Sequence, residues 1–241
     1  IATPTTRLNR DKLLAYLWPE SDEERGRNLL NVSAYAIRSA LGDDALLSAG
    51  DELRLNPDVV RTDVAEFEGA LSRGDHAQAV TLYKGPFLDG FFLSDAPGFE
   101  QWAERERERF AAEYRKALEA LAESEPDAAK AVAWWKLRAA QDPFDSRVAL
   151  RLMQALEASG NRAGALQHAA LHERMLKEEF GIAPPHELAA LVDRMRSGAA
   201  PSAPKASVPG PSHELMPLEA RESVPSALAP ESPRPRRWIF A

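Results

Sequence analysis

The sequence feature that most constrains the fold is a short internal repeat. The pattern Ala-x-Ala followed by Val or Leu occurs three times, at residues 77–80, 129–132 and 163–166. A turn signal stands just before each copy, namely Gly74-Asp75, Pro126-Asp127 and Gly160-Asn161. Each copy should therefore open a helix, and small alanines at this spacing let two helices pack closely. The repeat predicts stacked helix pairs.

The second and third copies, which begin at Ala129 and Ala163, are 34 residues apart, the period of tetratricopeptide arrays. The first copy lies further away because a long helix, predicted over residues 99–123, intervenes. The alternating charges of residues 104–109 within that helix predict a solvated stretch. We expect a tetratricopeptide-like helical domain over residues 63–196. The alternative is a generic helical bundle in which the alanines recur by chance.

The first sixty residues predict two helices and a hairpin. Leucines at helical spacing predict a helix over residues 10–17, which Pro19 ends. Ser21 and Glu24 fit a capping box, so Ser21 is the expected N-cap of a helix that runs to Leu41. After Gly42, two short extended runs around Gly50-Asp51 predict a small β-hairpin.

The helix after Ser21 carries the candidate functional residues. At 100° per residue, one face collects Arg27, Asn31, Ala34, Tyr35 and Arg38, with Asn28 at its edge. The opposite face, the expected core side, collects Leu29, Val32, Ser33, Ala36, Ile37 and Ala40. Arg side chains pair with guanine edges or phosphates, and Asn with adenine edges. Two helices and a hairpin with Arg54 therefore predict a helix-turn-helix with a wing, and DNA contacts from Arg27, Asn28, Asn31, Tyr35, Arg38 and Arg54. The alternative is an ordinary amphipathic helix with a solvated basic face.

Charge and composition restrict the function. The chain has a formal net charge of -7, which excludes a strongly basic coat. Residues 1–72 hold eight Lys and Arg against 13 Asp and Glu, a net of −5, which disfavours DNA away from the predicted face. Without cysteine the chain has no disulfide and no thiol nucleophile.

No enzyme site is evident in the sequence. It has neither a glycine-rich phosphate loop nor a Gly-x-Ser-x-Gly elbow. His168 and His172 have a metal-compatible spacing, but no third ligand is evident, so an exposed helix face is the preferred interpretation. We expect no catalysis, no cofactor, no bound metal and no small-molecule substrate.

The last 45 residues differ in composition from the rest. Nine of the 18 prolines lie between Ser197 and Arg237, which predicts a disordered linker over residues 197–241. The linker ends in a basic cluster followed by Trp238, Ile239 and Phe240. This is either a basic linker end or the cytoplasmic edge of a membrane helix. The chain begins at Ile1 without a signal-peptide pattern, so we read it as a fragment, cut at the front and at the back, and expect a cytoplasmic location.

Several segments together resemble the bacterial transcriptional activator domain family, the regulators of the Streptomyces antibiotic regulatory protein type. The segments that carry the resemblance are Arg10-Asp11-Lys12-Leu13-Leu14, Leu17-Trp18-Pro19-Glu20, Ile37-Arg38-Ser39-Ala40-Leu41-Gly42, Asp63-Val64, Phe67, Leu82 to Phe91, Phe99-Glu100-x-Trp102 with Arg107, Asp142-Pro143, Leu152 to Leu156, Gly160, Gly181-Ile182-x-Pro184 and Glu187-Leu188. The resemblance spans residues 8–196.

The resemblance implies a mainly α fold: a winged helix-turn-helix with a short hairpin wing, then a tetratricopeptide-like domain and a disordered tail. It makes the helix after Ser21 the recognition helix. Double-stranded promoter DNA, RNA polymerase or another protein, and a second copy of the chain are the implied partners. The family's winged helix begins with a small sheet and a first helix that this sequence lacks, so we expect a truncated version.

We expect three segments: a partial winged-helix domain over residues 1–62, the activator domain over residues 63–196, and the linker over residues 197–241. A helical-repeat interaction module without DNA binding, as part of a membrane-anchored protein, is the alternative function.

Overall fold

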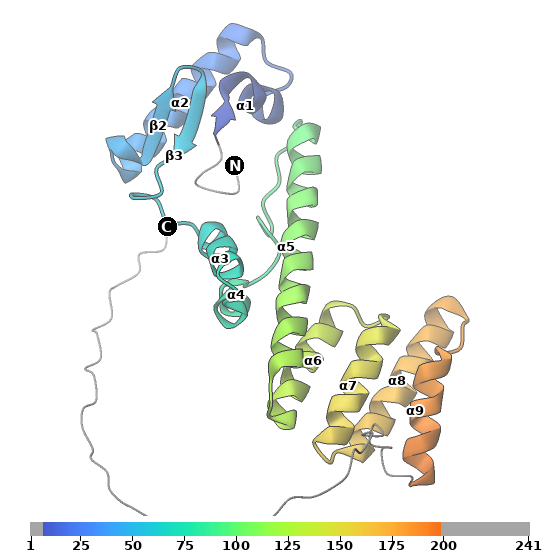
Figure 1. Cartoon of the computed structure of the whole chain (residues 1–241). Coiled ribbons are helices and arrows are strands. Elements are labelled where there is room, and N and C mark those ends of the chain that lie inside the picture. Colours follow the sequence, from blue (N-terminus) through green and yellow to red (C-terminus); the bar gives the residue numbers. More distant parts are fainter. Residues whose placement is uncertain (1–6, 199–241) are drawn as a thin grey trace, which may run out of the picture. The chain divides into compact units, whose positions relative to one another are not determined.

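The computed structural model of the chain describes residues 7–198, which are mainly helical (Figure 1). The N-terminal elements are β1 (Leu8–Asn9), α1 (Arg10–Leu17), α2 (Glu23–Leu41), a single 3₁₀ turn (Asp43–Ala45), β2 (Leu46–Ala49) and β3 (Glu52–Leu55). The helices that follow are α3 (Asp63–Ser72), α4 (His76–Leu82), α5 (Pro97–Ser124), α6 (Ala128–Gln141), α7 (Ser146–Ala158), α8 (Arg162–Phe180) and α9 (His186–Ser197).

The three strands form one antiparallel sheet in the order β1-β3-β2. β2 and β3 make the predicted hairpin, and Leu46 lies opposite Leu55 and Ala49 opposite Glu52. Gly50 takes φ +59° at the turn, a conformation that favours glycine. Sequence reasoning missed β1 because a two-residue strand has no periodicity to detect. β1 pairs with β3 and so ties the start of α1 to the hairpin.

The predicted N-cap of the second helix is wrong by one residue. The helix begins at Glu23, and the side chain of Asp22 accepts a hydrogen bond from the backbone N–H of Arg25. Asp22 is therefore the N-cap in place of Ser21. Both residue types cap helices well, so the capping-box pattern alone did not separate them. The C-terminal end at Leu41, followed by Gly42 at φ +103°, agrees with the prediction.

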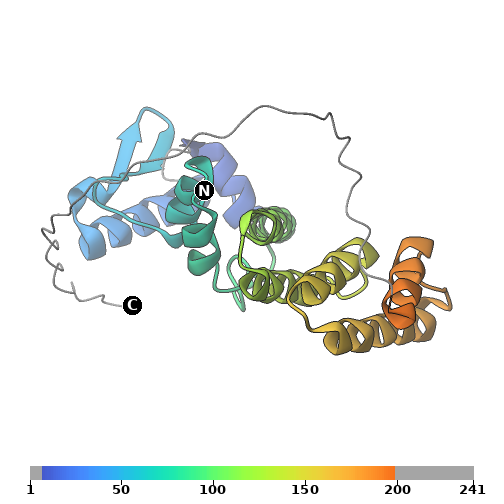
Figure 2. The same ribbon diagram turned by 60° about the horizontal axis from the view of Figure 1, so that its bottom comes forward.

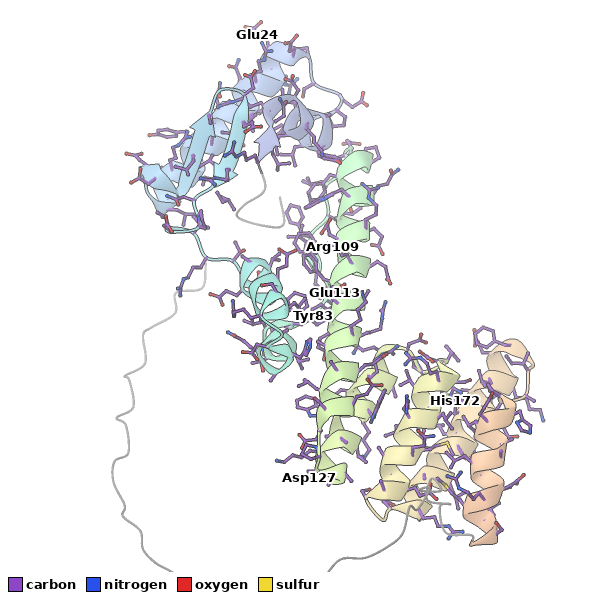
Figure 3. The ribbon with its side chains drawn as sticks, in the orientation of Figure 1. Glu24, Tyr83, Arg109, Glu113, Asp127 and His172 are labelled. Atoms are coloured by element: carbon purple, nitrogen blue, oxygen red, sulfur yellow. The ribbon has the colours of Figure 1, made fainter. Side chains whose placement is uncertain are left out.

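The three repeat copies occupy equivalent places in α4, α6 and α8. The third residue of each copy is buried, namely Ala79, Ala131 and Ala165. Each helix is also N-capped by the side chain two residues before the copy, namely Asp75, Asp127 and Asn161. Asp127 lies at the start of α6 (Figure 3). Because the three helices share the position of the cap and of the buried alanine, the repeat is structural and not a chance recurrence.

Successive helices from α5 to α9 pack against one another. Figure 2 shows α6 to α9 as a row of neighbouring helices. Val132, Leu152 and Leu188 belong to the main core of this row, and Leu118 belongs to a second core with α3 and α4. The predicted helical-repeat fold is therefore present.

The charged middle of α5 is not simply solvated, contrary to the prediction. The guanidinium of Arg107 donates to the backbone carbonyls of Phe87, Leu88 and Phe91 at 3.0–3.3 Å. The Arg109 side chain pairs with Glu68 of α3 at 2.8 Å. Charge alternation along a helix does not show which side chains neighbouring loops and helices will bind. Arg107 therefore holds the segment before α5 against this helix, and Arg109 links α3 to it.

A buried arginine joins α5, α6 and the start of α7. Arg138 is only 5% exposed, and its guanidinium donates to Glu119 at 2.7 Å and to Asp145 at 3.1 Å. Asp145 is also the N-cap of α7. Glu119 accepts two further hydrogen bonds from Arg147, at 2.8 and 3.1 Å. One charged cluster thus fixes three consecutive elements of the repeat.

This cluster predicts a specific loss of stability in acid. Burial alone would raise the pKa of Glu119, but the hydrogen bonds and charges of Arg147 and Arg138 outweigh it and hold the pKa below the ordinary 4.5. A lowered folded-state pKa adds stability above the unfolded value, and this stability is lost as the pH falls through the folded value. Below about pH 4.5 the wild-type unfolding free energy should therefore fall more steeply than that of Glu119→Gln. Urea unfolding between pH 7 and 3 measures both slopes.

Glu178→Gln, at an exposed site of α8, is the matched control and should follow the wild-type slope. Parallel curves for wild type and Glu119→Gln would contradict this role of the cluster.

Among residues 7–198, no helix combines the length and the apolar character that a membrane span requires. The predicted linker lies outside the described residues from position 199 onward, as do its basic end and Trp238 to Phe240.

Candidate nucleic-acid interface

The N-terminal elements have the arrangement of a helix-turn-helix with a hairpin. α1 ends at Leu17, a five-residue turn follows, and α2 begins at Glu23. The two helices and the hairpin share one core, in which Leu13, Leu30, Ala34, Leu46 and Leu53 are buried. This core leaves the opposite side of α2 in contact with solvent.

The core face of α2 only partly overlaps the face that was predicted as core: Ile37 packs against the core as expected, but Val32 does not. Gly26, Leu30 and Ala34 are the buried residues of α2, whereas Val32 is 66% exposed. Ala34, which was expected on the binding face, packs inward. On the side of α2 away from this core, the exposed side chains after the first turn form what we term the outward face: Arg25, Arg27, Asn28, Asn31, Val32, Tyr35 and Ser39. Glu23 and Glu24 of the first turn are exposed as well, as are Ala36, Ala40 and Leu41.

Four of the predicted contact residues lie on the outward face. Tyr35 is 73% exposed and Asn28 is also exposed. Arg27 is exposed and pairs with Glu23 one turn earlier, at 2.5 Å. The Asn31 carboxamide oxygen accepts a hydrogen bond from Arg10 at 3.0 Å. The structure therefore brings Arg27, Asn28, Asn31 and Tyr35 together on one exposed surface.

The other two predicted residues are placed differently. Arg38 donates to the backbone carbonyl of Leu46 from Nε at 3.2 Å and from Nη2 at 2.8 Å. Its Nη2 also donates to the hydroxyl of Ser48 at 2.8 Å. The guanidinium of Arg38 therefore fastens the hairpin to α2. Arg54 lines an apolar groove on the inner side of α2, away from the outward face.

Sequence reasoning missed three members of this region. Arg10 opens α1 and reaches across to Asn31, a contact between residues 21 positions apart that no local pattern predicts. Arg25 was left out, although its spacing from Asn28 and Val32 places all three on one helical stripe. Val32 was assigned to the core because it is apolar. The carboxylates of α2 are confined to its first turn, where Glu24 lies (Figure 3).

The apolar groove has a volume of about 430 Å³. Its walls come from α1, α2, the hairpin and the segment before α5, through residues such as Leu17, Ile37, Leu53 and Phe91. Leu17 also packs against the cluster of Phe99 and Ala103 at the start of α5. Leu17 therefore links the helix-turn-helix to the first turns of α5.

The two histidines of α8 serve the helical packing. His172 is 1% exposed, with Nε2 2.9 Å from the Ser146 hydroxyl and Nδ1 3.1 Å from the Pro143 carbonyl (Figure 3). The predicted exposed face is thus wrong for His172. Burial lowers the pKa of His168. The nearby His172 and Lys136 lower this pKa further. The two contacts of His172 join α8 to the turn before α7 and to the first residue of α7.

A family model and one curated relative match this chain. The model of the bacterial transcriptional activator domain matches residues 59–196, more than half of the chain. The chain is 29% identical to the regulatory protein AfsR of Streptomyces griseus over 227 residues, which cover 89% of this chain and 23% of AfsR.

The chain also shares a fold with Mycobacterium tuberculosis EmbR, solved in complex with a low-affinity phosphopeptide. The TM-score is 0.54 at 22% identity, over 80% of this chain and 56% of EmbR. This likeness supports the mainly helical architecture. The chain belongs to the bacterial transcriptional activator domain family.

Proposed function

We propose that the chain is part of a transcriptional regulator that binds double-stranded promoter DNA through α1, α2 and the hairpin. The observation that carries this proposal is the outward face of α2. From Arg25 to Leu41 the helix holds no carboxylate, and its exposed side offers guanidinium, carboxamide and phenol groups. These groups match phosphates and base edges in the major groove.

Within this proposal Arg27, Asn28, Asn31 and Tyr35 contact DNA, together with Arg25 and Arg10. Arg38 is a positioning residue, because its hydrogen bonds to Leu46 and Ser48 hold the hairpin against α2. Arg54 is not included, since it lines the groove on the inner side.

The proposed division follows the predicted segments: DNA binding within residues 1–62 and protein contacts within residues 63–196. RNA polymerase or another protein, and a second copy of the chain, are the proposed partners of the helical domain. Family membership supports the proposal that this domain acts in transcriptional regulation and that it catalyses no reaction. The chain spans 23% of AfsR, so activities of the whole relative come to this chain only as part of the proposal.

A binding titration tests the proposal. The chain is titrated against a pool of random labelled duplexes at about 0.05 and 0.2 M salt, followed by selection of the bound sequences. We expect binding that weakens by at least about tenfold between the two salt concentrations, as released counterions require. Absence of binding to any selected duplex at the lower concentration would overturn the proposal.

The acidic balance of residues 1–72 favours one other function, a protein-interaction module that does not use DNA. The hydrogen bond that holds Arg38 to the hairpin also favours this other function. Such a module would bind its protein partner through the helical repeat, and substitutions on the outward face of α2 would leave that binding unchanged.

A further inference from the structure

The outward face of α2 has an apolar centre. Val32 is 66% exposed and Tyr35, one turn further along, is 73% exposed. Asn28 precedes Val32 by four residues and Ser39 follows it by seven, so all four lie on one stripe. The stripe contains no charged group between Asn28 and Ser39.

Val32 contributes little to the fold. The core between α2 and its neighbours uses Leu30 and Ala34, with Ile37 packed against them, and Val32 lies on the far side of the helix. A β-branched residue also has lower helix propensity than most residues that can occupy an exposed helical position. Neither packing nor local propensity accounts for a valine at this place.

Base-pair chemistry offers a partner for this side chain. In the major groove the apolar group presented by the bases is the C5 methyl of thymine, and apolar side chains contact it. The same A·T pairs present adenine N7 and N6, which a carboxamide engages by two hydrogen bonds. One turn of α2 advances about 5.4 Å, and one base-pair step about 3.4 Å. Asn28 and Val32 therefore address base pairs one or two steps apart.

We propose that α2 selects A·T pairs, with Val32 against a thymine methyl group and Asn28 on the adenine edge of a nearby pair. This inference rests on the DNA-binding function proposed above and specifies what that surface reads. Arg25 and Arg27 lie on either side of the stripe, where they reach the phosphates that border the groove.

The thymine contact can be tested without altering the protein. In a duplex selected by the chain, each thymine is replaced singly by deoxyuridine, which removes only the methyl group. At one thymine we expect binding to weaken about fourfold, the factor for one methyl group removed from apolar contact. At the same position Val32→Ala should bind the thymine and deoxyuridine duplexes with nearly equal affinity.

Val59→Ala is the matched control, since Val59 is 45% exposed and lies beyond the hairpin. It should keep the full preference for thymine over deoxyuridine. Asn28→Ala should relax the preference for adenine at a position one or two steps away and leave the thymine effect in place. Far-UV circular dichroism confirms that each variant is folded.

The outcomes separate the two proposals. Equal binding of all deoxyuridine duplexes by the wild-type chain overturns the thymine contact while DNA binding stands. A Val32→Ala variant that still discriminates thymine from deoxyuridine overturns the assignment to Val32. Failure to bind any duplex overturns the DNA-binding function and this inference together.

Discussion

Arg138→Ala is expected to lower the free energy of unfolding by about 3 kcal/mol. The guanidinium is almost fully buried and holds Glu119 at 2.7 Å and Asp145 at 3.1 Å. Its removal leaves both carboxylates partly buried with one partner fewer, and it disconnects α6 from the N-cap of α7. The loss of unfolding free energy stays near the lower end of the range for broken buried ion pairs, because Arg147 still binds Glu119. Urea unfolding followed by circular dichroism measures the loss.

Arg194→Ala provides the control. Arg194 also pairs with a carboxylate of a neighbouring helix, Glu157 at 3.0 Å, but its side chain is 42% exposed. Exposed pairs contribute about 0–1 kcal/mol, so this variant should unfold close to wild type. Equal losses for Arg138→Ala and Arg194→Ala would show that the buried cluster does not hold the repeat together.

The double variant Arg25→Glu/Arg27→Glu is expected to weaken binding to a selected duplex at least about 50-fold in 0.1 M salt. Each neutralised phosphate contributes about 0.9 to the logarithmic salt slope, which corresponds to a factor of about eight at this concentration. Two lost contacts give about 60-fold, and the reversed charges add repulsion. The salt slope should fall by about two. Titrations across four salt concentrations measure both quantities.

The matched control is Arg162→Glu/Arg174→Glu. It makes the same change in net charge at two exposed positions of α8. It should leave both the affinity and the slope near the wild-type values, because screening limits the effect of remote charges. Wild-type affinity in the α2 variant, or an equal loss in the α8 variant, would contradict a local contact surface on α2.

The starts of the repeat helices were predictable because their signals are local. In each copy the N-cap lies two residues before the first alanine, and the buried alanine lies two residues after it. Both signals act within one turn of helix. α4, α6 and α8 therefore start where the sequence places them. The hairpin was predictable for the same reason, since Gly50 and Asp51 set its turn. β1 was not, because its two residues become a strand only by pairing with β3.

The core face of α2 was not predictable from periodicity. This helix carries apolar side chains around most of its circumference, including Leu29, Leu30, Val32 and Ile37. Two neighbouring stripes therefore fit a 100° repeat almost equally well. Contacts with Leu13, Leu46 and Leu53 select the stripe of Leu30 and Ala34. The candidate site changed accordingly, gaining Val32 and losing Ala34.

The sequence by itself determined the helical-repeat architecture, the family resemblance and the helix that bears the candidate surface. These depend on short-range spacing, capping and turn chemistry, which act before the chain is packed. Only the tertiary structure decided that Arg38 binds the hairpin, that Arg138 joins three elements and that Val32 faces solvent. Each of these depends on which distant residues become neighbours, and pairing between distant residues leaves no periodic trace along the chain.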